Sequence, residues 1–241
     1  MGTFYGITKM HPLVVMDGPA ASGKSSLARK VAAGLGWKHL NTGGMYRALA
    51  FLMSEFGKPK EELAEEAIET ISKIEFEVEG DTVKVDGRDV TSHLQDPIVR
   101  TTTSFYAAIP QVRPIMVTKQ RAIACAAPCI IDARDGKSHI APDADWCLYV
   151  SAELEKRAAW RLKDMHERGE RHALQAEIQR ELAARDLADM TRSVAPLEIA
   201  PEALELMSDY FVSSDSAAKQ VINLLKWADK VVAMKSVPTE E

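Results

Sequence analysis

One short segment near the amino terminus restricts the folds open to this chain more than any other. An apolar run at residues 13–16 (LVVM) leads into residues 17–25 (DGPAASGKS), which fit the pattern G-x-x-x-x-G-K-[ST] at every position. A helix-forming stretch follows at residues 25–33. The pattern therefore predicts a phosphate-binding loop that joins a buried strand to a helix.

The residue types in this loop suit an anion. Gly18 and Gly23 let the backbone curl so that several N–H groups point at one ligand. Lys24 adds a positive charge, and the Ser25 hydroxyl can bind Mg²⁺ at the start of a helix whose amino end favours negative charge. A glycine turn that merely starts a helix would leave the match in spacing and in both flanks unexplained.

The composition excludes several classes of protein. With 241 residues the chain can bury one large core, the size of a single α/β domain with insertions. It has no run of about 18 apolar residues that would cross a membrane, and its first residues lack the layout of a secretory signal or a myristoylation site. We therefore expect a soluble, cytoplasmic protein with no membrane partner.

Charge and cysteine usage narrow the ligands further. The formal net charge of −5 argues against general nucleic-acid binding. Cations are concentrated at residues 156–192, an arrangement typical either of a site for a small anion or of a solvated helix face. The three cysteines, Cys125, Cys129 and Cys147, lack CxxC spacing, so we expect them to be reduced and buried.

The remaining periodicity predicts an α/β fold. Further strands are expected at residues 37–40, 129–132, 146–150 and 210–212. Helical patterns are expected at residues 45–52, 60–73, 97–127, 152–168, 174–190 and 217–225. Strands separated by helices imply a parallel sheet with helices on both faces, whose ligands bind beyond the carboxyl ends of the strands. Gly18 and Asp132 both fall at such ends.

Two segments depart from this alternation. Residues 74–78 and 83–85 alternate polar and apolar side chains around Gly80-Asp81, which predicts an inserted hairpin with one wet face. The two charged helices that flank Gly169 predict a mobile lid.

We expect a single domain at 13–228, with a core of 13–58, 127–152 and 205–228, an inserted lobe of about 59–126, a lid of about 153–190, and terminal extensions 1–12 and 229–241.

Four elements in this order resemble bacterial cytidylate kinases. They are the phosphate loop, residues 42–47 (TGGMYR), Arg134-Asp135 and residues 192–197 (RSVAPL), with the hairpin insertion among them. The resemblance implies a P-loop nucleoside monophosphate kinase core with a parallel sheet flanked by helices, an inserted monophosphate-binding lobe carrying a small antiparallel sheet, and a helical lid. The activity it implies is phosphoryl transfer from Mg–ATP to CMP or dCMP, giving ADP and CDP or dCDP.

The resemblance also implies roles for individual residues. The donor would be bound by Gly18, Pro19, Ala20, Ala21, Ser22, Gly23, Lys24, Ser25, Ser26 and Arg161. The acceptor phosphate would be held by Arg47, Arg134 and Arg192, the cytosine edge by Ser104, Arg113 and Asp135, and the sugar by Tyr46, Arg185 and Asp189, with Thr42 as a further substrate contact. Lys24, Arg134, Arg185 and Arg192 would be catalytic, and Ser25 and Asp132 would bind Mg²⁺.

These roles agree with the chemistry of the side chains. Guanidinium groups bind phosphate oxygens in a bidentate manner, and the Asp135 carboxylate can accept a hydrogen bond from the exocyclic amine of cytosine. Uracil presents a carbonyl there, which a carboxylate repels. Asp132 keeps two interpretations from the residues alone, a magnesium ligand or a buried acceptor for backbone donors.

The chain departs from the family pattern near the proposed site. The family usually has Asp in place of Asn41, and it reads DGRDIGT where residues 132–138 are DARDGKS. We expect the changes at Asn41 and Lys137 to make the local potential more positive. Two lid positions that are commonly arginine are Trp160 and Ala188, for which Arg157, Arg161 and Arg185 are close enough in sequence to compensate.

Two other functions stay open at this stage. One is a nucleotide-binding sensor or partner protein that keeps the fold but has lost efficient transfer. The other is a kinase for a different monophosphate such as UMP, against which Asp135 argues. For the cytidylate kinase reading the expected partners are small nucleotides (CMP, dCMP and ATP), with no nucleic acid, and we expect a monomer.

Overall fold

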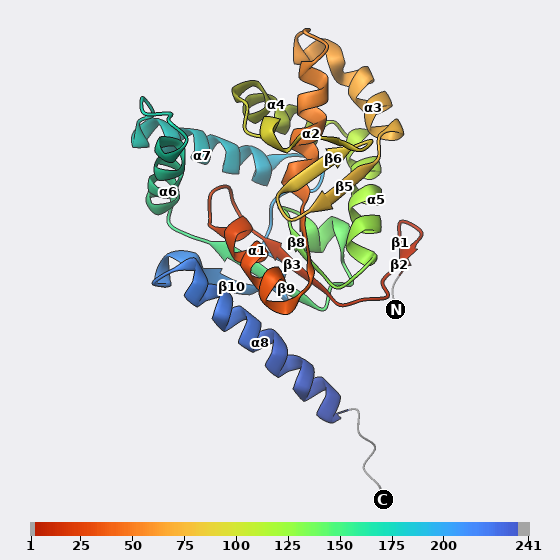
Figure 1. Cartoon of the computed structure of the whole chain (residues 1–241), viewed down its shortest axis with the longest axis vertical. Helices are drawn as coiled ribbons and strands as arrows, with labels where there is room; N and C mark the ends of the chain where they lie inside the picture. Colours follow the sequence, from red (N-terminus) through yellow and green to blue (C-terminus); the bar gives the residue numbers. More distant parts are fainter. Residues whose placement is uncertain (1–2, 236–241) are drawn as a thin grey trace, which may run out of the picture.

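Five parallel strands form the centre of the molecule in the computed structural model, which describes residues 3–235 (Figure 1). The strands are β3 (Leu13–Asp17), β4 (Lys38–Asn41), β8 (Cys129–Asp132), β9 (Trp146–Ser151) and β10 (Leu204–Met207), and their order across the sheet is β10-β9-β3-β8-β4. Every residue of β3 and β8 is buried, as expected of apolar parallel strands covered on both faces. The predicted α/β class is confirmed.

Helices cover both faces of this sheet. On one face, α1 (Lys24–Leu35) and α8 (Ser214–Lys235) pack against Val14, Met16 and Leu148. On the other, α2 (Thr42–Ser54) and α5 (Val112–Cys125) cover Val15 and Ile131. Alternate residues of β3 thus enter separate clusters, because successive side chains of a strand point to opposite faces.

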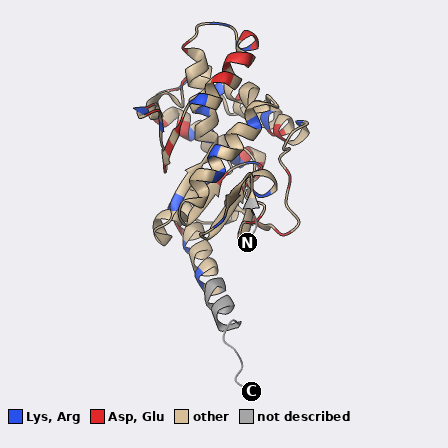
Figure 2. Cartoon of the chain, turned by 90° about the vertical axis from the view of Figure 1, so that its right-hand side faces the viewer, with Lys and Arg blue, Asp and Glu red and all other residues tan. Residues whose placement is uncertain are grey.

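An inserted lobe follows α2. It contains η1 (Lys60–Leu63), α3 (Ala64–Lys73), β5 (Phe76–Glu79), β6 (Thr82–Val85), β7 (Arg88–Asp89), η2 (Thr91–His93) and α4 (Pro97–Ala108). The predicted hairpin is confirmed as the antiparallel pair β5-β6, and β7 adds a third strand after the turn at Asp86-Gly87. Acidic side chains of η1 and α3 gather at the far end of this lobe (Figure 2).

The predicted pair of lid helices is α6 (Leu154–Glu167) and α7 (Gln175–Thr191). These helices pack on each other through Ala158, Ile178 and Leu182, and the same cluster includes Ala20 of the phosphate loop. In Figure 1 the lid lies to the left of this loop and the inserted lobe to the right. Three parts of the chain that are distant in sequence therefore lie around the carboxyl ends of the parallel strands.

The predicted last strand at residues 210–212 is wrong. The strand is β10, Leu204–Met207, and Ser208–Tyr210 form the short turn η4. Tyr210 and Val212 are 81% and 100% exposed, so their apolar character does not report burial. β10 is an edge strand with β9 as its one neighbour, which explains why its sequence, LELM, lacks the apolar run of a central strand.

The amino-terminal segment, which the sequence left without an interpretation, forms a small hairpin of β1 (Thr3–Phe4) and β2 (Ile7–Thr8). The fully buried Arg121 of α5 holds it, since Nε and Nη2 each donate to the Ile7 carbonyl at 3.2 Å. The same guanidinium forms two 2.9 Å hydrogen bonds to Asp143. At the other end, α8 extends to Lys235, and residues 236–241 lie outside the described range.

The expectation for the cysteines is confirmed. Cys125, Cys129 and Cys147 are free and buried, and burial raises the pKa of Cys129 and of Cys147 to about 12. These thiols are therefore neutral at physiological pH. Within residues 3–235, no helix combines the length and the apolar character needed to cross a membrane.

Candidate active site

The phosphate loop lies at the point where the sheet topology reverses. β3 and β8 are neighbours, but the chain leaves β3 through α1 toward β4 and leaves β8 toward β9, on the opposite side. Adjacent strands whose connections diverge leave a crevice at their carboxyl ends, where ligands bind. The loop after β3 and the residues after Asp132 border that crevice.

Close packing explains the first glycine of the loop. Gly18 has φ +144°, and a Cβ there would lie 2.0 Å from the Val150 carbonyl oxygen of β9. Any other residue would push the loop away from the sheet. Helix α1 begins at Lys24, so its free N–H groups and the positive end of its dipole face the same crevice.

Lys24 and Asp132 form a buried ion pair at the bottom of the crevice. Burial by itself raises the pKa of the Asp132 carboxyl, but the charge of Lys24 and the nearby His39 hold that pKa well below its usual range. Oδ2 of Asp132 has no hydrogen-bond partner, and Nε2 of His39 lies 3.9 Å from it. Among residues 3–235 no backbone N–H donates to this carboxylate, and Thr42 Oγ1 donates to the Asp132 carbonyl instead, at 2.8 Å.

A paired network of three arginines and two carboxylates occupies one side of the cleft. Asp135 pairs with Arg113 and, at 3.3 Å, with Nη2 of Arg192. Asp189 lies 3.6 Å from Nη1 of Arg192 and 3.3 Å from Nε of Arg134. Opposite charges alternate along this network, so its side chains are held in place without a ligand.

The buried ring of Tyr46 lies 5.8 Å from the Arg113 guanidinium, and its hydroxyl has no hydrogen-bond partner in the described part of the chain. A buried hydroxyl left in this state is available to a ligand.

A second set of arginines has no such partners. Among the described residues, Arg47, Arg161 and Arg185 form no ion pair or hydrogen bond with a carboxylate. Arg47 and Arg185 each feel the charges of Arg134 and Arg161, which Asp132 and Asp189 partly offset. Partial desolvation by the surrounding protein, then the charge of Arg134, lowers the pKa of Arg185 to about 10. The side chain stays open to solvent, which screens this repulsion, and it remains charged at pH 7. Repelling cations held together in a cleft form a site for an anion.

Most of the side chains predicted for the substrate thus lie near one another, but Ser104 is an exception. It lies on α4 with an exposed side chain and forms no hydrogen bond to Arg113 or Asp135. Its role in reading the base stays a prediction, as do the roles of the other predicted site residues.

A contact between lid and phosphate loop was not foreseen from the sequence. Oδ1 of Asp186 accepts the Ala20 N–H at 3.2 Å, and Nη1 of Arg157 donates to Asp186 Oδ2 at 2.6 Å and to the Ala20 carbonyl at 3.0 Å. Arg157 is therefore engaged in this contact, and its compensation for Trp160 stays a prediction. The contact joins residues that are far apart in the chain, so no local sequence pattern predicts it.

The two departures from the family pattern have different consequences. Lys137 turns away from the cleft, where Nζ donates to the Pro142 carbonyl at 2.8 Å and pairs with Glu202 at 3.1 Å. The expectation that Lys137 makes the electrostatic potential of the site more positive is therefore wrong. Asn41 caps α2 by accepting the Gly44 N–H at 3.1 Å. A Cβ on Gly43 would lie 3.4 Å from Arg47 Nη1 and 3.5 Å from Asn41 Oδ1, so an aspartate at 41 would stand beside Arg47.

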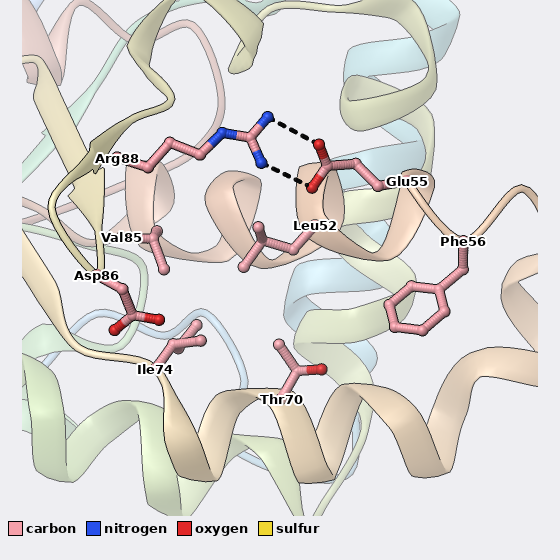
Figure 3. Close-up of a pocket in the computed structure, with 8 residues that line it drawn as sticks. All are labelled: Leu52, Glu55, Phe56, Thr70, Ile74, Val85, Asp86 and Arg88. Carbon is pink, nitrogen blue, oxygen red and sulfur yellow. Dashed lines mark hydrogen bonds and ion pairs between the residues drawn. The ribbon is translucent and has the colours of Figure 1, made fainter.

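A separate hollow lies between the end of α2 and the inserted lobe (Figure 3). It is lined by Leu52, Glu55, Phe56, Thr70, Ile74, Val85, Asp86 and Arg88. Arg88 is held by Glu55 through two hydrogen bonds of 2.8 and 3.1 Å. Because this pair is satisfied internally, the hollow offers no free cation to a phosphate, unlike the main cleft.

The divergent strands and the phosphate loop define a P-loop phosphotransferase fold, and comparison with known proteins specifies the family. The family model described as cytidylate kinase matches residues 14–227, and the chain belongs to this family. The match includes the sheet, the inserted lobe and the lid.

Relatives of two kinds are similar to the chain. The cytidylate kinase of Symbiobacterium thermophilum is 36% identical over 197 residues, covering 80% of this chain and 86% of the relative, and that of Caldanaerobacter subterraneus is 32% identical, covering 88% and 94%. The bifunctional pantoate ligase/cytidylate kinase of Synechocystis is 34% identical over 91% of this chain, which spans only 44% of that relative.

Proposed function

We propose that this chain transfers the γ-phosphoryl group of ATP to CMP or dCMP, giving ADP and CDP or dCDP. The observation that carries the proposal is the set of unpaired arginines, Arg47, Arg161 and Arg185, gathered beside Arg134 and next to a phosphate loop. Each substrate brings phosphate groups, and only such groups neutralise so many cations in one cleft.

The paired network can recognise the base of the acceptor. Asp135 already faces two arginines, so its carboxylate is oriented before a ligand arrives. It can accept a hydrogen bond from the cytosine amine, while Arg113 can donate to the ring acceptors. Tyr46 and Asp189 adjoin this network and would contact the sugar.

Transfer requires alignment more than proton chemistry. The second pKa of a phosphate monoester is about 6, so the acceptor oxygen is ionised near pH 7 and needs no general base. Loop N–H groups, Lys24 and the arginines then stabilise the charge that spreads over the transferring group. The lid excludes water from the cleft, which favours transfer to CMP over hydrolysis of ATP.

The donor set also fits a magnesium ion. The orphaned Oδ2 of Asp132 and the hydroxyl of the exposed Ser25 are oxygen ligands of the kind that Mg²⁺ prefers. When bound with ATP, the ion would neutralise charge on the phosphates. In the described part of the chain, no cluster of three or more His, Cys, Asp or Glu residues competes as a metal site.

The test is ADP production from Mg–ATP with CMP, dCMP, UMP, AMP or no acceptor, by the wild type and by Asp135→Ala. We expect turnover of CMP and dCMP well above UMP, and a loss of this preference in the variant. ATP binding without acceptor-dependent ADP release would instead indicate a sensor or partner protein. Preferred turnover of UMP would indicate the other alternative.

A further inference from the structure

Asp17 is a buried carboxylate that the mechanism above does not use. It is the last residue of β3 and is 3% exposed. Its Oδ1 accepts the Gly136 N–H at 2.9 Å and its Oδ2 accepts the Lys137 N–H at 3.0 Å. Both oxygens of Asp17 therefore hold the backbone directly after Asp135.

The approach of the two segments is unusually close. A Cβ on Gly136 would lie 3.0 Å from Asp17 Oδ1 and 2.8 Å from Val15 Cγ1. Glycine at 136 thus permits the carboxylate to reach two successive N–H groups. The segment then continues as the short π-helix η3 (Gly136–Ile140), so Asp17 holds the start of this turn.

Asp135, the residue before this contact, has other partners. Its carboxylate meets Arg113 and Arg192. A carboxylate can present its oxygens to a base only if the backbone that carries it is held in place. The two hydrogen bonds that Asp17 accepts fix the backbone at residues 136 and 137 from the interior of the sheet.

We propose that Asp17 is a positioning residue, which orients Asp135 for recognition of the acceptor base by fixing the backbone at 136 and 137. This inference rests on the proposed function, since it takes Asp135 to contact cytosine. Asp17 itself touches neither substrate.

The surroundings of Asp17 make this hold sensitive to pH. Burial raises its pKa to about 6, against the opposing effect of the Lys137 and Gly136 N–H groups. Asp135 raises this pKa further and Lys24 lowers it, and Cys147 and Tyr149 of β9 are the other titratable groups close to it. Below about pH 6, a protonated Asp17 no longer accepts both N–H groups as an anion, so the hold on Asp135 weakens.

The test measures cytidine binding by calorimetry between about pH 5 and about pH 8. Cytidine carries no phosphate, so its own charge changes little in this range. We expect wild-type affinity to fall about tenfold from the upper to the lower pH, as for loss of one hydrogen bond to a charged group. Asp17→Asn should bind weakly throughout, with no such pH dependence, because its amide accepts one N–H and opposes the other.

Two further variants separate positioning from general stability. Asp145 also accepts a backbone N–H, that of Leu13 at 2.8 Å, but at the opposite end of β3. Asp145→Asn should keep the wild-type affinity and pH profile. Gly136→Ala should weaken cytidine binding as Asp17→Asn does, because its Cβ displaces the carboxylate. Thermal unfolding of each variant checks that it is folded; Asp17→Asn removes a buried charge and should fold.

Wild-type affinity or an unchanged pH profile in Asp17→Asn would overturn the inference. So would absence of cytidine binding by a wild type that turns over CMP, since Asp135 would then not read the base. Absence of CMP turnover would overturn the proposed function itself, which is a separate result.

Discussion

Two groups of arginines face the same cleft and differ in their partners. Arg113 and Arg192 alternate with Asp135 and Asp189 in a network whose charges nearly cancel. Arg47, Arg161 and Arg185 have no carboxylate partner among residues 3–235 and repel one another. The first group is ordered by the protein, and the second needs an anion to become stable.

This difference matches the two tasks of a nucleotide site. A base is neutral and is recognised by the direction of its hydrogen bonds, so its readers must be held before it binds. A transferring phosphoryl group is highly charged, and cations left unneutralised by the protein stabilise it most. The comparison predicts that the two groups of residues respond differently to substitution.

The largest effect is expected for Lys24→Ala, at the bottom of the cleft. This change removes the charge next to the donor phosphates and leaves Asp132 buried without its partner. We expect kcat to fall by about 1,000-fold or more. Steady-state kinetics measure the fall in kcat, and Lys30→Ala on the same helix is the control. A loss of kcat under about tenfold in Lys24→Ala would contradict the proposed role of Lys24 in transfer.

Arg185→Ala and Arg113→Ala compare the two groups directly. Loss of the unpaired Arg185 should lower kcat by about 100-fold or more while leaving thermal stability unchanged, because a repelling charge is removed. Loss of the paired Arg113 should cost about 3 kcal/mol of stability and raise KM for CMP, since Asp135 loses a buried partner. Denaturant unfolding and steady-state kinetics of both variants test this contrast, with Arg180→Ala as the control. Equal losses of stability in Arg185→Ala and Arg113→Ala would contradict the difference between the two groups.

Asp186→Asn tests the attachment of the lid to the phosphate loop. The change leaves Arg157 buried without its carboxylate, next to the Ala20 peptide. Arg161 lies one helical turn from Arg157, and Arg185 is next to Asp186 in the chain. Without the contact, neither arginine is held in a fixed position relative to the phosphate loop. We expect kcat to fall about tenfold with a smaller change in KM for CMP. The exposed Asp164→Asn is the control, and an unaltered kcat would show that the attachment does not serve transfer.

The smallest effect is expected for Asn41→Asp, which gives one unpaired arginine a partner. The aspartate should still cap α2, as asparagine does, but its charge would stand beside Arg47. We expect KM for CMP to rise about two- to fivefold at low salt, with the difference shrinking as salt screens the pair. A lower KM, or a difference that salt leaves intact, would argue against an electrostatic cause.

Local patterns predicted much of the fold and of the candidate site. Residues 13–25 predicted the strand, the loop and the start of α1, because backbone turns and phosphate contacts there depend on neighbouring residues. The hairpin at β5-β6 and both lid helices also followed from periodicity. The last strand was misplaced, since an exposed aromatic run and an edge strand both break the link between apolar sequence and burial.

The sequence by itself determined which chemical groups are available: a phosphate loop, Lys24, Asp135 and an excess of arginines. Only the tertiary structure decided which of these charges are neutralised. Arg157 pairs with Asp186, Lys137 with Glu202 and Asp17 with the backbone after Asp135, each across more than 20 residues of chain. Charge in a cleft depends on distances in space, and spacing along a sequence does not contain those distances.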